Sequence, residues 1–154
     1  MEYLQTDNFF NEEINAEGCL FFSLMDITEN HTGHSFIPKT INKLYNHLND
    51  TTFIRYGKTY PLMSNTCYVN NHEKCIQEAL EVFGCHDKVK YVGAEYNSFY
   101  TKRKSWGNKN GMYIIMQYKT ANGNGHFRRI FYDPYKPDIK LVGLMSIRFY
   151  DIGI

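Results

Sequence analysis

The chain has 154 residues, of which 43% are hydrophobic and 21% charged, and this size and balance indicate one folded domain and exclude general disorder. Lys and Arg number 17 against 16 Asp and Glu, a net charge of +1, so no global field draws the chain to nucleic acid or to an anionic membrane, and any such binding must be local. No apolar run approaches the roughly 20 residues that span a bilayer, and the first residues lack the basic and apolar parts of a signal peptide. We therefore expect a cytoplasmic protein without a membrane partner.

The first expected element is a buried helix. Residues 18–26 are apolar on nearly every side, which is typical of a helix packed all round, and Cys19 stands in its first turn. Residues 28–35 then read as a loop that holds His31 and His34. Because no helix fixes the spacing of these two histidines, we expect no metal site there.

Two further helices are expected before the middle of the chain. An apolar stripe over 37–48 predicts an amphipathic helix. Turn signals follow, within which 51–55 is compatible with a short strand. The third helix is capped by Asn70 or Asn71 and is ended by Gly84.

Everything after the third helix reads as sheet. Four segments are rich in β-branched and aromatic residues and are separated by turn clusters: 89–96, 111–119, 127–132 and 140–150. Helices first and strands afterwards are typical of an α+β protein. We expect a single domain over 1–154, with a helical part over about 1–88 and a sheet part over about 89–154.

The cysteines form no recognisable framework. None belongs to a C-x-x-C pair, so neither a zinc knuckle nor a disulfide scaffold is predicted. The four are Cys19, Cys67, Cys75 and Cys85. A cysteine in an apolar helix is most often a small buried side chain, but Cys19 is distinguished by its place at a helix start, where unpaired amides and the helix dipole favour a thiolate nucleophile.

A thiolate nucleophile needs a base, and the base comes from the sheet in folds whose cysteine opens a helix. His126 is the candidate, because it follows a Gly-rich turn at the start of an expected strand. Asp133 ends the same segment and would orient the imidazole ring. The alternatives without catalysis are that His126 is a histidine at a strand end and that Asp133 opens an ordinary Asp-Pro turn.

These residues carry a resemblance to a known class. The motifs are Gly18-Cys19-Leu20-Phe21-Phe22-Ser23-Leu24, then Gly125-His126-Phe127, then Tyr132-Asp133-Pro134. Their order resembles that of the papain-like cysteine peptidases, especially the branch of bacteriocin-processing peptidases. Most of the chain is also similar to an uncharacterised family found on spirochaete plasmids and prophages, through Cys67-Tyr68-Val69-Asn70-Asn71 and Arg148-Phe149-Tyr150.

The resemblance implies a papain-like α+β fold, in which the helix that carries Cys19 packs with the other helices on a C-terminal antiparallel sheet. It implies cleavage or transfer at an amide or thioester through an acyl-enzyme on Cys19, with His126 as base and Asp133 as orienting acid. A peptide or protein would be the substrate, and no cofactor and no metal would be needed.

Two departures from the papain-like pattern stand out. His126 and Asp133 are only seven residues apart, and an extended strand of that length would separate them by about 23 Å. A tight turn at 128–130 would bring them together, but that segment holds no Gly, Pro, Asn or Asp. The family's oxyanion amide is also missing from its place before the cysteine, where Asn15 or Gln5 would substitute.

Two other function classes stay open. One is a papain-like binding module without catalysis, of plasmid or phage origin, that engages a host protein. The other is binding of single-stranded nucleic acid, since bases stack on rings and phosphates bind cations, although a solvated turn explains the same residues. The candidate surface consists of Lys102, Arg103, Lys104, Trp106, Arg128 and Arg129.

Overall fold

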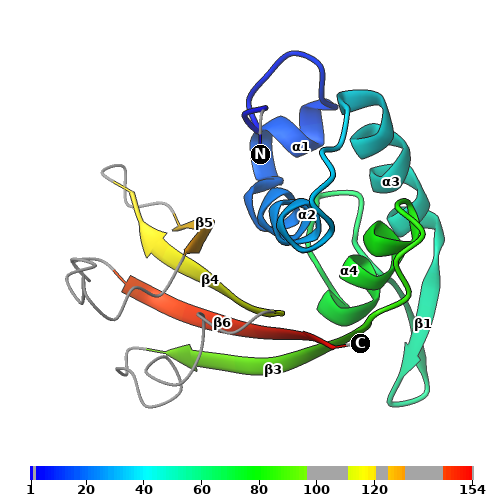
Figure 1. Cartoon of the computed structure of the whole chain (residues 1–154), viewed down its shortest axis with the longest axis vertical. Helices are drawn as coiled ribbons and strands as arrows, with labels where there is room; N and C mark the ends of the chain where they lie inside the picture. Colours follow the sequence, from blue (N-terminus) through cyan, green and yellow to red (C-terminus); the bar gives the residue numbers. More distant parts are fainter. Residues whose placement is uncertain (2, 97–110, 121–124, 131–143, 154) are drawn as a thin grey trace. The chain divides into compact units, whose positions relative to one another are not determined.

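Helices make up half of the described chain before residue 88, and an antiparallel sheet follows (Figure 1). The computed structural model describes residues 1, 3–96, 111–120, 125–130 and 144–153. The chain divides into two units, Met1–Asp87 and Lys88–Ile154, next to the boundary expected between the helical and sheet parts. The predicted α+β class is confirmed, whereas the papain-like topology and the single domain stay predictions.

The first unit contains four helices and a two-stranded hairpin among its described residues. In chain order these are α1 (Glu12–Glu17), α2 (Cys19–Thr32), α3 (Pro38–Asp50), β1 (Thr52–Arg55), β2 (Lys58–Pro61) and α4 (His72–Glu81). Helix α2 packs against α4, and α3 packs against α4 and β2. Leu24, Ile41 and Leu80, one from each of α2, α3 and α4, are buried, and burial of apolar side chains is the dominant favourable term in folding.

Helix α1 was not expected from the sequence, and it meets α2 at Gly18. The Gly18 N–H donates to Ile14 O at 2.9 Å, and Gly18 O accepts from Phe22 N–H at 2.7 Å. A Cβ atom at Gly18 would lie 2.5 Å from Ile14 O, so this junction needs a residue without a side chain. The glycine therefore fixes the point where Cys19 begins α2.

Helix α2 continues six residues beyond the segment predicted for it, so the loop expected over 28–35 is wrong for its first five positions. The hydroxyl groups of Thr28 and Thr32 donate to the carbonyls four residues earlier, at 3.2 and 2.9 Å. These polar residues are thus satisfied inside the helix instead of interrupting it. Gly33, with φ of 72°, ends α2 and donates to Glu29 O at 2.9 Å, so His31 stands on the last helical turn.

Helix α4 has both ends expected from the sequence. The Asn71 side chain accepts the Lys74 N–H at 3.0 Å and caps the start. At the other end Gly84 has φ of 69°, Gly84 N–H donates to Glu81 O at 3.0 Å, and Cys85 N–H donates to Leu80 O at 3.1 Å. This pair of bonds is a Schellman motif, and it fixes the backbone of Cys85.

Strands β1 and β2 form a hairpin of which only the first strand was compatible with the sequence signals. Arg55 pairs with Lys58, and the two loop residues, Tyr56 and Gly57, have φ of 51° and 75°, as in a type I′ turn. Phe53 is the one buried residue of the two strands. The second strand escapes prediction because its side chains show no alternation between buried and exposed positions.

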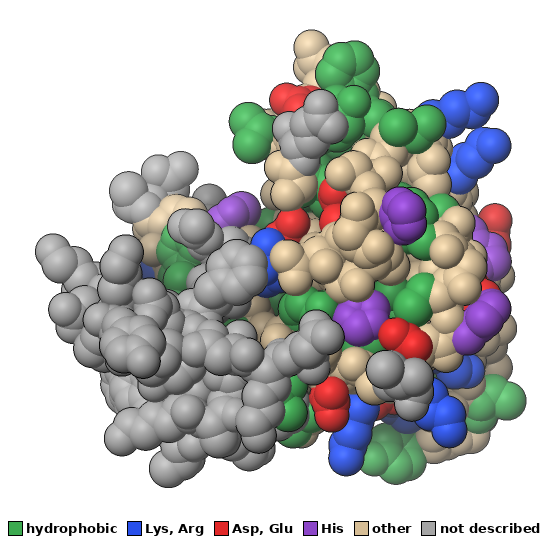
Figure 2. Space-filling model, in the orientation of Figure 1, with side chains coloured by type: hydrophobic (Ala, Val, Ile, Leu, Met, Phe, Trp, Pro, Cys, Tyr) green, Lys and Arg blue, Asp and Glu red, His purple; other side chains and the backbone are tan. Residues whose placement is uncertain are grey.

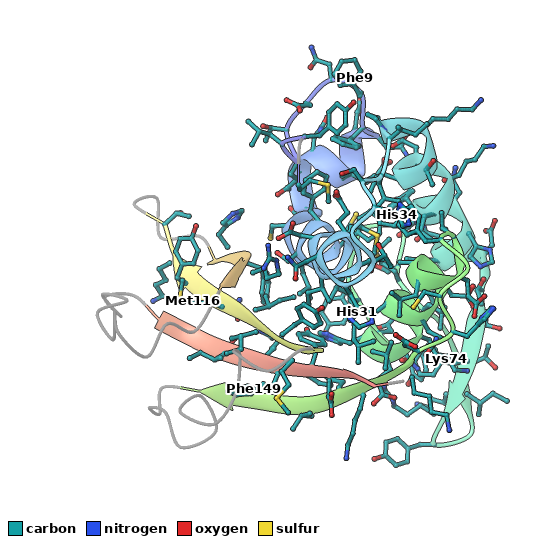
Figure 3. All side chains as sticks on the ribbon, in the orientation of Figure 1. Phe9, His31, His34, Lys74, Met116 and Phe149 are labelled. Carbon is teal, nitrogen blue, oxygen red and sulfur yellow. The ribbon has the colours of Figure 1, made fainter. Side chains whose placement is uncertain are left out.

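The second unit is a four-stranded antiparallel sheet in the order β3-β6-β4-β5. Its strands are β3 (Lys88–Tyr96), β4 (Met112–Lys119), β5 (Gly125–Ile130) and β6 (Leu144–Gly153). The buried side chains Ile114, Ile147 and Phe149 form one cluster on the two inner strands, and Figure 3 shows Phe149 on β6. The predicted strands are confirmed where the structure describes them.

Candidate functional site

The predicted catalytic residues belong to different parts of the chain. Cys19 is the first residue of α2 in the first unit and is partly exposed. His126 lies in β5 of the second unit, opposite Tyr118, and the two rings meet edge to face at 5.5 Å. Asp133 lies outside the described residues. The catalytic assignment of these residues therefore stays a prediction.

The tight turn that would return Asp133 toward His126 is not formed at 128–130. Residues 125–130 are one strand, β5, paired in continuous register with β4 from Lys119 to Ile114. By Ile130 this strand has carried the backbone about 13 Å from His126. The short spacing between the two residues thus remains a departure from the papain-like pattern.

The two oxyanion candidates have another role in the structure. Gln5 Nε2 donates to Ile14 O at 3.0 Å and to Asn15 O at 3.1 Å. Asn15 Nδ2 donates to Gln5 O at 2.7 Å and to Asp7 O at 3.1 Å. Both amide groups donate to backbone carbonyls and so join the N-terminal segment to α1, and their oxyanion role stays a prediction.

Two of the six residues of the candidate basic surface lie among the described residues. Arg128 and Arg129 lie on β5, opposite Met116 and Ile115 of β4. The other members, Lys102, Arg103, Lys104 and Trp106, lie outside the described residues. The nucleic-acid hypothesis stays untested.

The four cysteines are free thiols and fall into two groups by solvent exposure. Cys67 and Cys75 are buried, and burial raises the pKa of each thiol to about 12. A thiol in such a site is inert at neutral pH. Cys19 and Cys85 are partly exposed, so they are the two thiols with access to reagents.

Three histidines pair with carboxylates among the described residues. His47 pairs with Glu78 and His86 with Glu81, each at 2.9 Å, and their imidazole rings are 52% and 76% exposed. Figure 2 shows acidic side chains beside histidines on the face of the first unit that it presents. Such exposed pairs contribute little to stability.

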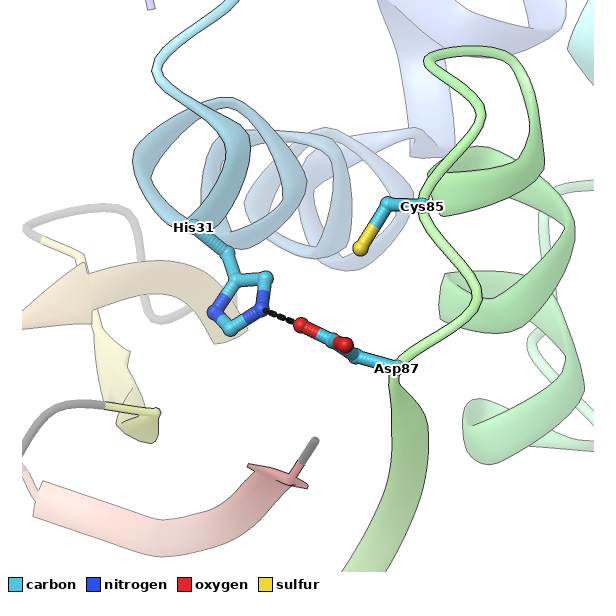
Figure 4. A group of neighbouring side chains, drawn as sticks. All are labelled: His31, Cys85 and Asp87. Atoms are coloured by element: carbon cyan, nitrogen blue, oxygen red, sulfur yellow. Dashed lines mark hydrogen bonds and ion pairs between the residues drawn. The ribbon is translucent and has the colours of Figure 1, made fainter.

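The third pair is different because it is sheltered and has a thiol beside it. His31 Nε2 lies 2.8 Å from Asp87 Oδ2, and the two side chains are only 12% and 27% exposed. The ligand atoms of His31, Cys85 and Asp87 all lie within 4.8 Å of one another. Figure 4 shows the three side chains pointing toward one another, His31 from α2 and the other two from the segment after α4. The hydrogen bond from His31 lowers the pKa of Asp87 below its ordinary value.

Packing around Phe83 holds together the two segments that carry this trio. The His34 imidazole stacks on the Phe83 ring at 5.5 Å, and Phe36 packs on the same ring at 4.6 Å. Gln77 Nε2 donates to the backbone O of Asp87 at 2.9 Å. The end of α2 and the segment after α4 are thus positioned independently of any ligand.

Sequence patterns alone do not predict this trio. His31 and Asp87 are 56 positions apart, and no short motif joins them. His31 was also assigned to a loop, since the continuation of α2 was missed. The one available signal is the run Cys85-His86-Asp87 directly after the helix-ending Gly84, which places two ligand types one residue apart at a fixed backbone position.

Comparison with known proteins adds no family to these observations. No family model, no curated protein and no solved structure matches the chain. Within the described residues, every helix is too short or too polar to cross a bilayer. The fold and site therefore define an α+β protein with a sheltered His-Cys-Asp cluster.

Proposed function

We propose that this chain is a small thiol hydrolase of the papain-like kind, with Cys19 as its nucleophile. The observation that carries the proposal is the exposure of Cys19. Two of the four thiols are buried, whereas Cys19 is partly exposed at the first residue of helix α2. The other thiol with access, Cys85, belongs to the cluster with His31 and Asp87, where the three ligand atoms lie within 4.8 Å of one another. Cys19 instead stands outside that cluster, at the first residue of α2.

In the proposed reaction the Cys19 sulfur attacks the carbonyl carbon of an amide or thioester. His126 takes the thiol proton as the bond between the Cys19 sulfur and the carbonyl carbon forms. It then passes this proton to the leaving amine or thiol as the scissile bond breaks, which leaves the acyl group on Cys19. Water then hydrolyses the acyl-enzyme and regenerates the thiol. The Cys19 backbone N–H contributes to stabilising the oxyanion.

The test is the labelling rate of Cys19 by an active-site thiol probe, measured in a Cys85→Ser background so that one accessible thiol remains. We expect rapid labelling that His126→Ala slows strongly. His47→Ala is the matched control, because His47 is an exposed histidine of the first unit paired with Glu78, and it should leave the rate unchanged. Equal, slow labelling with and without His126 would refute the proposal.

A binding module without catalysis is the second candidate, and the β1–β2 hairpin favours it. Ile54 is 75% exposed and Tyr56 is 98% exposed at the hairpin turn, and exposed apolar residues of this kind are enriched at protein interfaces. This candidate predicts that Cys19→Ala keeps both the fold and the biological effect of the protein, whereas replacement of both hairpin residues by Ser removes the effect. Loss of the effect in Cys19→Ala at unchanged stability would favour the hydrolase.

A further inference from the structure

We infer that the first unit binds a divalent transition metal, with Zn²⁺ as the expected ion, through His31, Cys85 and Asp87. The donor set is an imidazole nitrogen, a sulfur and a carboxylate oxygen. Zn²⁺ accepts all three, whereas Mg²⁺ and Ca²⁺ require oxygen ligands throughout. The mixed chemistry of the cluster thus selects a borderline-soft ion.

The spacing of the donors fits a tetrahedral ion. Zinc bonds of about 2.0–2.3 Å separate neighbouring ligand atoms by about 3.3–3.6 Å. The three ligand atoms here lie within 4.8 Å of one another, and His31 Nε2 is 2.8 Å from Asp87 Oδ2. Side-chain adjustments of about 1 Å would therefore bring all three to bonding distance, with the ion in place of the proton that His31 and Asp87 share.

The arrangement of the trio favours a metal over a catalytic triad. In a Cys-His-Asp triad the imidazole stands between the thiol and the carboxylate. Here one hydrogen bond joins His31 Nε2 to Asp87 Oδ2, and the Cys85 sulfur lies within 4.8 Å of both ligand atoms (Figure 4), so the three donors form a compact group instead of a line through the imidazole. A cation bound among the three would neutralise the carboxylate and the thiolate together, while binding releases the Cys85 proton to solvent.

The protein positions these ligands before any ion binds. His31 stands on the last turn of α2, where the negative end of the helix dipole favours a cation. The Schellman motif fixes the backbone of Cys85, and Gln77 holds the backbone of Asp87. Partial exposure of the His31 and Asp87 side chains gives an ion a path from solvent and leaves its fourth position for water.

This inference is independent of the proposed hydrolase, because Cys19 is not a ligand. The first consequence is mechanical: the ion would link the end of α2 to the segment after α4, across 56 positions of sequence. Since the unfolded chain does not hold the three ligands together, an ion that binds the folded state stabilises it by mass action.

The experiment is titration of the reduced, metal-free, full-length protein with Zn²⁺ by calorimetry and with Co²⁺ by absorption spectroscopy. We expect one equivalent of ion, a thiolate-to-cobalt charge-transfer band, and a higher thermal midpoint with Zn²⁺. Cys85→Ser should remove the band and weaken Zn²⁺ binding at least about tenfold. His31→Gln and Asp87→Asn should weaken binding similarly, with circular dichroism of each variant confirming its fold.

Two control variants make the result specific to the trio. Cys19→Ser removes the other accessible thiol, and His86→Ala removes an exposed imidazole between two of the ligands. Both should bind Zn²⁺ as the unmodified protein does. Absence of stoichiometric binding, or a charge-transfer band that survives in Cys85→Ser and disappears in Cys19→Ser, would overturn the inference.

Discussion

Substitution of Gly18 by Ala tests the α1–α2 junction and the position of Cys19 together. The new Cβ atom would lie 2.5 Å from Ile14 O and 2.9 Å from Ile14 Cα, and these are backbone atoms of a fully buried residue. Relief therefore requires a shift of one helix against the other. Overpacking of this kind costs about 1–3 kcal/mol, and the reduced entropy of the unfolded chain offsets about 0.4–1 kcal/mol.

The net expectation for Gly18→Ala is a loss of about 1–2 kcal/mol, from the overpacking cost less the entropic gain. With a slope of about 2 kcal/mol per molar urea, the unfolding midpoint would fall by roughly 0.5–1 M. Far-ultraviolet circular dichroism during urea unfolding measures this change, because α1 and α2 contribute to the helical signal.

Gly153→Ala is the matched control for the same experiment. A Cβ atom at Gly153 meets no described atom within 4 Å, and its φ is not positive. This variant should be as stable as the unmodified protein or slightly more so. A Gly18→Ala protein at least as stable as the unmodified one would refute the steric reasoning, and so would an equal loss in both variants.

Three further predictions follow from the same structure. A thiol reagent at pH 8 should modify two cysteines of the metal-free protein quickly and the others only after unfolding, because burial raises the pKa of Cys67 and Cys75 to about 12; rapid reaction of all four would contradict this. Asn71→Ala should lower the free energy of unfolding by about 1 kcal/mol in urea titrations, since its side chain caps the Lys74 N–H, whereas Asn71→Asp should retain the cap. Glu29→Gln should raise the thermal midpoint at pH 7, because burial raises the Glu29 pKa and its Oε1 has no hydrogen-bond partner among the described residues.

The pH dependence of the Glu29 prediction has a definite sign. Because the pKa is higher in the folded state, the folded protein holds this proton more tightly, and stability falls as pH rises from the ordinary value of 4.5 through the folded pKa. The difference between Glu29→Gln and the unmodified protein should therefore disappear below about pH 4.5, where the carboxyl is protonated in both states. Melting curves collected across this range check it, and a constant difference at every pH would count against the burial argument.

Sequence patterns predicted best those elements whose ends are set by residues close in sequence. Helix α4 was expected with its cap at Asn71 and its end at Gly84, because capping depends on residues within one turn. The length of α2 was underestimated because Thr28 and Thr32 are polar, and only the structure shows that their hydroxyls bond within the helix. Propensity is a weak guide where side-chain hydrogen bonds and burial decide the outcome.

The candidate sites were less accessible to sequence reasoning than the fold. A thiol at a helix start is a local feature, and Cys19 does begin α2. The His31–Asp87 pair depends on how the ends of α2 and α4 meet, through stacking of side chains on Phe83. Contacts of this kind join residues without any shared spacing, so pattern analysis of one sequence does not reveal them.

The central position of β6 affects how the second unit forms during synthesis. β6 is the last of the described strands in chain order, yet it lies between β3 and β4. A ribosome adds about 5–20 residues per second, so several seconds pass between the emergence of β3 and that of its partner. During that interval β4 and β5 can already pair as a hairpin, whereas β3 offers hydrogen-bonding groups to other chains. Nascent-chain aggregation should therefore begin at β3, after the helical unit has emerged in full and has begun to fold.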